Sequence, residues 1–249
     1  MMKQFLRRNF SVICICLGAV TVLLFGAYLE RTLGSSAVSA GVTAKPQTGL
    51  VIILDAGHGG IDGGAVSKDG TVEKDINLAI TLKLRDLLSL SGYQVVLTRD
   101  TDRSIHSEGA VSIRDIKRSD LQNRLELTNT FPNGIFVSIH QNYYTESKYS
   151  GAQFFYSPNH AGSQVLAETL QSLFREKLQP QNERQIKPAG KDLYLMTNIK
   201  IPAVLAECGF LSNVTEAALL TEEEYQQKIA FVLYEGLLSY LRNAAQPQT

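Results

Sequence analysis

The chain has 249 residues, 44% of them hydrophobic, which is ordinary for a globular protein with a buried core. The formal net charge is zero, and the part beyond residue 45 holds 19 basic and 23 acidic residues. A domain that is slightly acidic gives no electrostatic reason to expect nucleic acid as a partner.

An uncharged apolar run covers residues 10–29 and follows three basic residues, Lys3, Arg7 and Arg8. As a helix this run would reach roughly 30 Å, the thickness of the hydrocarbon core of a bilayer. The positive-inside rule leaves residues 1–9 in the cytoplasm and places the rest outside. We therefore expect a transmembrane signal anchor at residues 10–29 and a membrane-anchored, extracytoplasmic protein.

Two alternatives to the anchor stay open at this point. The small residues Val38, Ser39 and Ala40 would suit the cleavage site of a signal peptide, and a buried core helix is the second alternative. Residues 30–47 are small and polar without periodicity, which predicts a linker. The folded domain is expected over residues 48–243, with a short tail at 244–249.

Short apolar runs alternate with amphipathic stretches along this domain. Strands are predicted at residues 50–54, 94–98, 134–140, 152–157, 193–196 and 203–206. Helices are predicted at residues 75–90, from a cap at Ser119 with Leu121 and Leu125 facing inward, at 163–178 and at 223–241. This alternation predicts a single α/β domain whose mostly parallel, twisted central sheet is flanked by helices.

Four polar residues lie where predicted strands end or the first helix begins. In chain order they are His58 after the first strand, Glu73 at the helix start, His140 at the end of the third strand and Glu207 at the end of the last. In an open α/β sheet the carboxyl ends of the strands face a common crevice, so these side chains can converge. Two neutral imidazoles and one carboxylate form the ligand set of a catalytic zinc, and a further carboxylate beside them would suit a proton acceptor.

Each of the four residues also has a purely structural interpretation. His58 can belong to a glycine turn, His140 can be a packed histidine, and Glu73 is favoured at a helix start by the helix dipole. Glu207 is the least expected, because a carboxylate that ends an apolar strand loses hydration unless positive charge is near. Further candidates for supporting or substrate contacts, each equally a turn or capping residue, are Asp55, Asp62, Asp75 and Asn142.

Four separated segments carry a resemblance to a known family: LDAGHGGIDGGA, EKD, SIHQN and PAVLAECGFLSN. In this order and at these separations they resemble the signature segments of zinc-dependent N-acetylmuramoyl-L-alanine amidases, over about residues 50–242. The resemblance implies that Zn²⁺ is bound by His58, Glu73 and His140 and that Glu207 is catalytic. It also implies hydrolysis of the amide between N-acetylmuramic acid and the first L-alanine of the peptidoglycan stem peptide.

Within this family, the N-terminal run and the segments SGAQFFY and DLYLMTN resemble the germination-specific amidases of spore formers. This narrower resemblance implies a role in spore cortex maturation, through muramic δ-lactam formation, and in germination. A general lytic amidase of vegetative cells and a non-catalytic peptidoglycan-binding membrane protein are the alternatives. An accessory protein partner is a further possibility that the sequence does not specify.

The cysteines exclude an intramolecular disulfide in the exported part. Cys14 and Cys16 lie in the apolar run, so Cys208 stands alone beyond it. A rival interpretation makes Cys208 the nucleophile of a cysteine peptidase, with His58 or His140 as its base. The predicted position of Cys208 beside a carboxylate, with no helix start to acidify the thiol, speaks against this rival.

Overall fold

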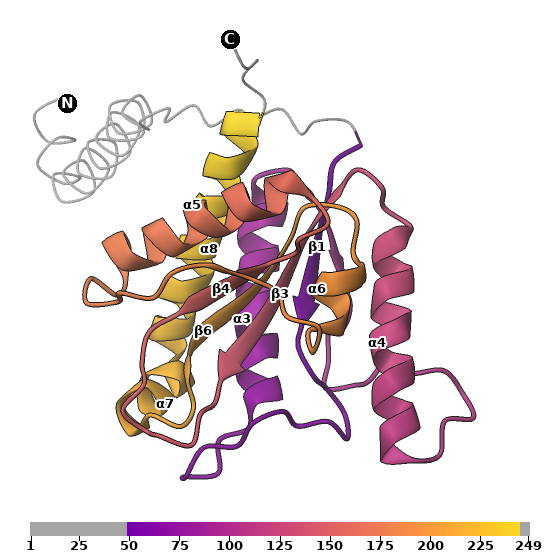
Figure 1. Cartoon of the computed structure of the whole chain (residues 1–249), viewed down its shortest axis with the longest axis horizontal. Helices are drawn as coiled ribbons and strands as arrows, with labels where there is room; N and C mark the ends of the chain where they lie inside the picture. Colours follow the sequence, from indigo (N-terminus) through magenta and orange to yellow (C-terminus); the bar gives the residue numbers. More distant parts are fainter. Residues whose placement is uncertain (1–48, 245–249) are drawn as a thin grey trace, which may run out of the picture. The chain divides into compact units, whose positions relative to one another are not determined.

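The computed structural model describes residues 49–244 (Figure 1). The expected cytoplasmic stub, the anchor at residues 10–29 and the linker lie outside the described residues, as does the tail beyond residue 244, and they stay predictions. No helix within residues 49–244 combines the length and the apolar character that crossing a bilayer requires.

Strands and helices alternate through most of the described chain. In order they are β1 (Val51–Ala56), α3 (Glu73–Leu90), β2 (Gln94–Leu97), α4 (Ile113–Asn129), β3 (Gly134–Asn142), β4 (Gln153–Tyr156), α5 (Ala161–Lys177), β5 (Lys187–Pro188), α6 (Tyr194–Asn198), β6 (Ala203–Phe210), α7 (Val214–Thr221) and α8 (Glu223–Ala244). The predicted α/β class is confirmed.

The strands form one six-stranded sheet in the order β2-β1-β3-β6-β4-β5. The first four of these strands are mutually parallel, whereas β4 runs antiparallel to β6 and parallel to β5. The sheet is therefore mixed: its parallel part agrees with the prediction, and the last two strands reverse direction. Because β1, β3 and β6 are parallel neighbours, their carboxyl ends meet at one edge of the sheet.

Helices cover both faces of the sheet (Figure 1). On one face α3, α5 and α8 pack against the strands through a large apolar cluster that includes Ile80, Leu170 and Leu237. On the other face a smaller cluster joins Phe136 of β3 to Leu195 and Met196 of α6, and α4 lies beside it. Burial of both faces explains why β1 and the first six residues of β3 are buried throughout.

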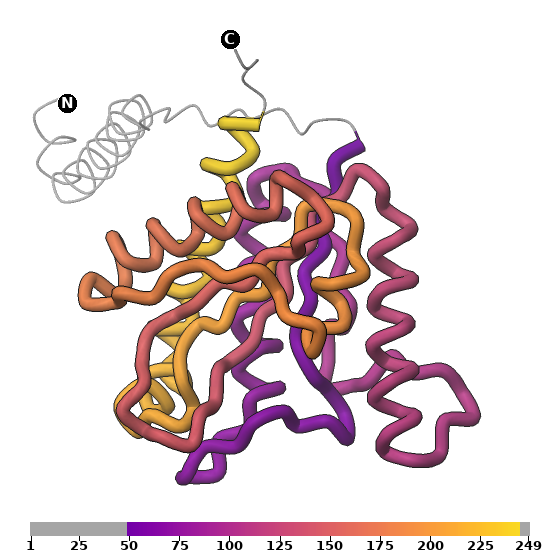
Figure 2. The backbone as a smooth tube through the Cα atoms, in the orientation of Figure 1, coloured from indigo at the N-terminus to yellow at the C-terminus, as the bar shows by residue number. Residues whose placement is uncertain are grey.

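The segments that follow β1 and β2 lie side by side, although they are far apart in sequence (Figure 2). The carboxylate of Asp102 accepts a hydrogen bond from the backbone N–H of Gly60 at 2.8 Å and pairs with Nζ of Lys74 at 2.6 Å. These contacts tie the turn after β1 to the start of α3. At the edge where the strands end, the loops after β1 and β2 are therefore held together by hydrogen bonds and an ion pair.

The strand predicted at residues 193–196 is wrong, because the chain forms the short helix α6 there. Leu195, Met196 and Ile199 are all buried in the same cluster. Adjacent residues of a strand point to opposite faces, whereas positions i, i+1 and i+4 can share the buried side of a helix. The side chain of Asn198 also hydrogen-bonds the carbonyl of Tyr194, one helical turn back.

Two further boundaries, the orientation of Leu121 and two short elements differ from the sequence prediction. Helix α4 begins at Ile113 and is capped by Ser112, whose Oγ accepts the N–H of Asp115 at 3.1 Å, so Ser119 is not the cap. Leu121, expected to face inward, is 37% exposed, because much of α4 faces solvent and the edge of a cleft. Strand β6 continues past Glu207 to Phe210, and α7 and β5 were not predicted.

Candidate metal centre

His58 lies in the tight turn that leaves β1. Its backbone φ is 62°, in the left-handed region that few residues other than glycine adopt, and Gly59 and Gly60 that follow also have positive φ. The neighbouring Gly57 cannot carry a side chain, since a Cβ there would lie 2.2 Å from Nε2 of His140. The glycines thus let the backbone turn closely around two imidazole rings.

Glu73 is the first residue of α3 and is almost fully buried. Its Oε2 accepts the N–H of Ala65 at 2.8 Å, and its Oε1 accepts the N–H of Gln141 at 3.0 Å. Burial alone would raise the pKa of this carboxyl, but hydrogen bonds and charge interactions with His140 and His58 outweigh burial and hold the pKa well below its usual range. Glu73 is therefore a fixed, ionised carboxylate.

The structure brings the three predicted ligands together. The donor atoms of His58, Glu73 and His140 all lie within 4.8 Å of one another. Nε2 of His58 is 3.2 Å from Oε2 of Glu73, and Nδ1 of His140 is 2.9 Å from Oε1 of the same carboxylate. Two imidazoles and one carboxylate match the donor set of a catalytic zinc site that leaves a position for water.

The electrostatics around His58 favour a positive charge at this point. Nδ1 of His58 is 2.9 Å from Oδ2 of Asp62, which leaves Nε2 to face Glu73. Burial would lower the pKa of His58, yet Asp62 and Glu73 raise it to about 9. A cluster that stabilises a cation so strongly fits a divalent metal ion, and the imidazole–carboxylate pair is the usual arrangement that orients a metal-binding histidine. Asp62 thus has a supporting position.

Glu207 lies beside this cluster on the neighbouring strand. It pairs directly with His140 across β3 and β6. Its Oε2 is buried and has no hydrogen-bond partner among residues 49–244. Burial raises the pKa of the Glu207 carboxyl to about 7; the negative charge of Glu73 adds to this effect, and the charges of His140 and His58 offset it only partly. A buried carboxylate without a partner, next to a cation site, is poised to accept a proton.

Two buried arginines hold the turn that carries His58, and sequence reasoning missed both. Arg124 pairs with Asp55 at 2.5 Å and with Asp120 at 2.7 Å, and it donates to the carbonyl of His58 at 2.7 Å. Arg99 is fully buried and donates to carbonyls on three separate stretches of chain: Ala56, Gly57, Lys74 and Thr101. Their spacing in the sequence gives no periodic signal, so only the fold shows that they meet.

The other sequence candidates have different positions. Asp55 is buried in the ion-pair cluster with Arg124 rather than among the ligands, and it also accepts from Ser138. Asp75 is exposed on α3, and Asn142 ends β3, where its carbonyl accepts the N–H of Leu211. His160 caps α5, so it has a structural role that the sequence analysis did not assign.

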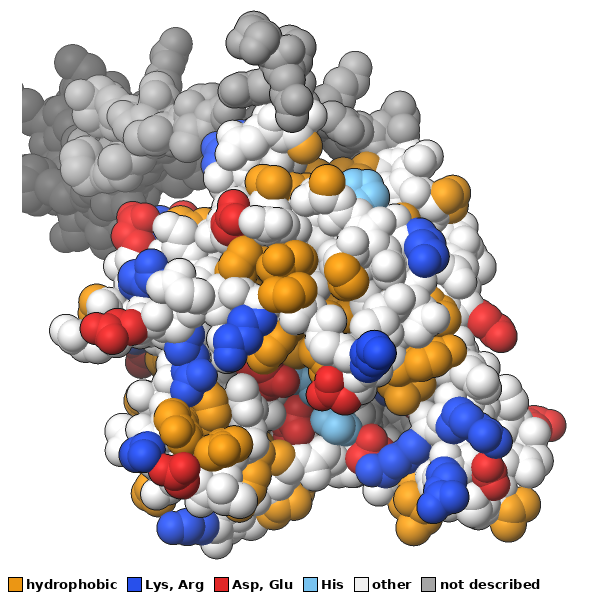
Figure 3. Space-filling model, viewed as in Figure 1, with side chains coloured by type: hydrophobic (Ala, Val, Ile, Leu, Met, Phe, Trp, Pro, Cys, Tyr) orange, Lys and Arg blue, Asp and Glu red, His pale blue; other side chains and the backbone are white. Residues whose placement is uncertain are grey.

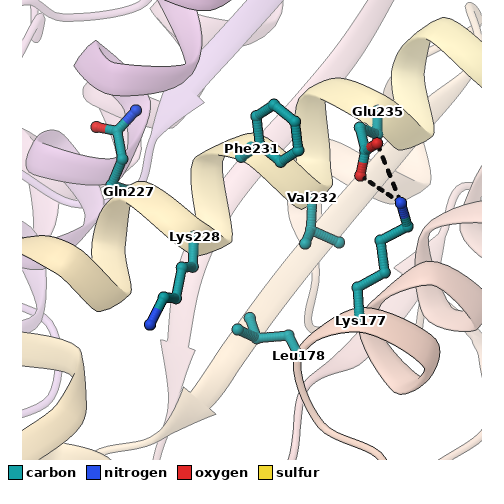
Figure 4. A pocket seen from close by; sticks show the side chains of 7 residues that line it. All are labelled: Lys177, Leu178, Gln227, Lys228, Phe231, Val232 and Glu235. Carbon is teal, nitrogen blue, oxygen red and sulfur yellow. Dashed lines mark hydrogen bonds and ion pairs between the residues drawn. The ribbon is translucent and has the colours of Figure 1, made fainter.

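A cleft opens between this cluster and helices α4 and α6. A cavity of about 150 Å³ is lined by His58, His140, Asp62, Leu121 and Leu195, among others, and a second of about 120 Å³ shares His140, Leu121 and Leu195 with it. Figure 3 shows acidic and histidine side chains in a hollow of this face, with basic side chains on both sides of it. A larger groove of about 420 Å³ lies between α5 and α8 and contains none of these residues (Figure 4).

Cys208 does not face the cleft. It belongs to the large apolar cluster on the opposite face of the sheet from the ligands, as the alternation along β6 after Glu207 requires. Burial, and secondarily the charge of Glu207, raise the pKa of its thiol far above the ordinary value. A thiol in this position is not a nucleophile, which removes the basis for a cysteine peptidase.

We expect iodoacetamide to leave Cys208 unmodified in the folded protein at neutral pH, because the buried thiol stays protonated and inaccessible. The measurement is mass analysis of the proteolytic peptide that contains Cys208 after alkylation, which keeps Cys14 and Cys16 apart, with the same protein alkylated in denaturant as the positive control. Stoichiometric labelling of the native protein, with loss of activity, would contradict the assignment.

Comparison with known families identifies the family of the chain that carries this cluster. Residues 52–239 match the family model described as N-acetylmuramoyl-L-alanine amidase. The chain belongs to this amidase family. The match spans the whole of the sheet apart from Val51, and it includes the cluster of His58, Glu73 and His140 together with Glu207.

Individual relatives of the amidase agree with this result. The chain is 38% identical to the germination-specific N-acetylmuramoyl-L-alanine amidase of Bacillus subtilis (strain 168) over 202 residues, 81% of this chain and 84% of that protein. It is similar to the CwlD amidase from Clostridioides difficile, solved in complex with the GerS lipoprotein, with a TM-score of 0.75 and 48% identity over 78% of this chain and 98% of that one. The amidase AmiC2 of Nostoc punctiforme follows with 0.66 and 28%, covering 78% and 97%.

Proposed function

We propose that the amidase binds one zinc ion through His58, Glu73 and His140 and uses Glu207 to move protons during hydrolysis. The observation that carries this proposal is the unpartnered, buried Oε2 of Glu207 beside a cluster of three metal-binding side chains. When bound, zinc would polarise the scissile carbonyl and lower the pKa of a water molecule to about 7.

The protein's own groups supply the remaining steps. Oε2 of Glu207 accepts a proton from the attacking water and passes it to the nitrogen of L-alanine. The leaving group is then a neutral amine and not an amide anion. Asp62 keeps Nδ1 of His58 hydrogen-bonded, which fixes the ring with Nε2 toward Glu73. Arg99 and Arg124 hold the carbonyls of the turn from Ala56 to His58 and keep the ligand cluster in register.

We also propose a role in the spore cortex, supported by the similarity to the germination-specific amidase of Bacillus subtilis. The enzyme would remove stem peptides from a subset of muramic acids and leave lactyl carboxylates that a second enzyme closes to the δ-lactam. The apolar run at residues 10–29 supports a membrane anchor that places the domain outside the cytoplasm. Because the related CwlD amidase was solved with a lipoprotein, we propose an accessory protein partner here as well.

The function is tested on purified peptidoglycan with the full chain. We expect one zinc per chain by elemental analysis, loss of turnover on chelation and recovery on adding zinc. Mass analysis should find released peptides with a free L-alanine amine and glycan with free lactyl carboxylates. Products cut at a glycosidic bond or within the peptide would exclude the amidase reaction. Deletion in the host should give cortex without muramic lactam, and unchanged lactam content would reject the spore role.

Removing the partner of His58 should weaken metal binding. In Asp62→Ala the imidazole loses the group that orients it, so we expect about 10- to 100-fold weaker zinc affinity. The measurement is competition against a chromophoric chelator. Asp75→Ala is the matched control, since Asp75 is an exposed carboxylate near the start of the same helix as Glu73. Equal zinc affinities of the two variants would show that Asp62 has no part in the site.

A further inference from the structure

The guanidinium of Arg184 lies against Phe210, the last residue of β6, and has no role in the proposal above. Its Cζ lies 4.4 Å from the centroid of the Phe210 ring and 5.8 Å from that of Tyr149. Its Nε donates to the carbonyl of Ser150 at 2.7 Å and its Nη1 to Oε1 of Gln153 at 3.3 Å. Stacking and hydrogen bonding together hold the planar group in one orientation.

The charge of Arg184 is not matched inside the protein. No carboxylate among residues 49–244 lies within ion-pair distance of it, in contrast to the buried Arg124, which pairs with two aspartates. The carboxylate of Glu216 responds to the charge of Arg184, but its own oxygens already accept the N–H groups of Gly151 at 2.9 Å and Phe210 at 2.8 Å. A fixed guanidinium without an acidic partner is suited to a carboxylate supplied by a ligand.

Sheet geometry places Arg184 near Glu207. Gln153, which binds its Nη1, pairs with Glu207 across β4 and β6. Both residues lie two positions from residues of the smaller apolar cluster, Phe155 and Leu205, so they face the same side of the sheet as that cluster. Directly opposed Cβ atoms are roughly 5 Å apart. The side chain of Gln153 and the 3.3 Å hydrogen bond therefore link the guanidinium of Arg184 to the position directly opposite Glu207, on the same side of the sheet.

The chemistry of the substrate indicates which carboxylate can reach the guanidinium of Arg184. N-acetylmuramic acid uses its only carboxyl group to form the scissile amide, so a free carboxylate near that bond belongs to the peptide. The residue after L-alanine keeps a free α-carboxylate where it is joined to the third residue through its side-chain carboxyl, and two residues of extended chain span roughly 7 Å. We propose that Arg184 binds the α-carboxylate of this second stem residue and thereby marks the peptide side of the cleft. The proposal rests on the amidase function above.

Paired ligands test the proposal by binding, without turnover. The protein is the zinc-loaded full chain carrying Glu207→Gln, and the probes are two N-acetylmuramoyl tripeptides that differ only in an α-carboxylate or an α-carboxamide on the second residue. We expect the carboxylate ligand to bind at least tenfold more tightly. Adding Arg184→Ala should weaken that ligand about 10- to 100-fold, the range for a hydrogen bond to a charged group, and leave the carboxamide ligand unchanged.

Controls separate recognition from a structural effect. Arg184→Lys, which keeps the charge but not the planar fork, should recover only part of the preference. Arg85→Ala removes an exposed charge on α3, which covers the other face of the sheet, and should change neither affinity. Equal weakening of both ligands by Arg184→Ala, or no weakening, would overturn the proposal. Failure of the unsubstituted enzyme to cleave peptidoglycan would instead refute the amidase function, while the ligand pair still reports on Arg184.

Discussion

Replacing Glu207 by glutamine is expected to lower turnover by about 100- to 10,000-fold, the contribution of a well-placed general acid–base group. The amide has nearly the same shape as the carboxylate, but it cannot accept and return a proton. The metal should stay bound, because Glu207 is not among the three clustered donors. The measurements are the rate of stem-peptide release and the zinc content of the same preparation.

A matched substitution shows whether the loss is specific to the cleft. Glu168→Gln makes the same chemical change on the exposed surface of α5, where the carboxylate only accepts a hydrogen bond from Gln164. It should retain normal turnover and normal zinc content. Near-normal turnover of Glu207→Gln would remove the proton-transfer role, and loss of zinc from it would make Glu207 a ligand instead.

The second large effect is expected on stability, from the buried pair of Arg124 and Asp55. Both side chains are almost fully buried, and their closest atoms are 2.5 Å apart. Arg124→Met leaves the carboxylate of Asp55 without its cation, which typically costs about 3–5 kcal/mol of the free energy of unfolding. Denaturant unfolding at neutral pH measures this cost. Arg118→Met, at an exposed position of the same helix α4, should change the free energy of unfolding by less than about 0.5 kcal/mol.

The pH dependence of this deficit has a definite sign. In the unsubstituted protein burial would raise the pKa of Asp55, but Arg124, Ser138 and other partners lower it below its ordinary value of 3.8. This carboxylate therefore stabilises the protein above that pH, and the contribution is lost as the pH falls through the depressed pKa. In Arg124→Met the pKa of Asp55 should rise instead, so the deficit should be small in acid and grow toward neutral pH. A deficit independent of pH would contradict the ion-pair account.

The parts of the fold that the sequence predicts are those where one strong local signal dominates. The apolar runs of β1 and β3 are buried on both faces, so every side chain along them carries the signal. The convergence of the three proposed ligands could be predicted because His58 and His140 follow or lie within such runs and Glu73 begins a helix. The shared edge of parallel strands then makes their convergence a matter of topology.

Other features depend on contacts that leave no local pattern. Helix α6 has only five residues, and its buried leucine and methionine resemble a short strand until the packing against Phe136 is known. Arg124 sits in a helix that looks charged and exposed in sequence, and its partner Asp55 is 69 residues away. No local sequence pattern at Arg124 or at Asp55 predicts their ion pair. The same holds for Arg184, whose aromatic neighbours come from a loop and from β6.

The pairing of His140 with Glu207 sets the distance between the proposed ligand and the proposed proton acceptor. This distance is fixed by the hydrogen-bonded ladder of β3 and β6, whose strands are held about 4.8 Å apart whatever side chains they carry. The loops that frame the cleft, after β1 and after β2, are not part of this ladder. Over evolutionary time such loops can lengthen, shorten or change composition and so alter which wall fragments fit. The separation of His140 and Glu207 stays the same, because the backbone of β3 and β6 sets it.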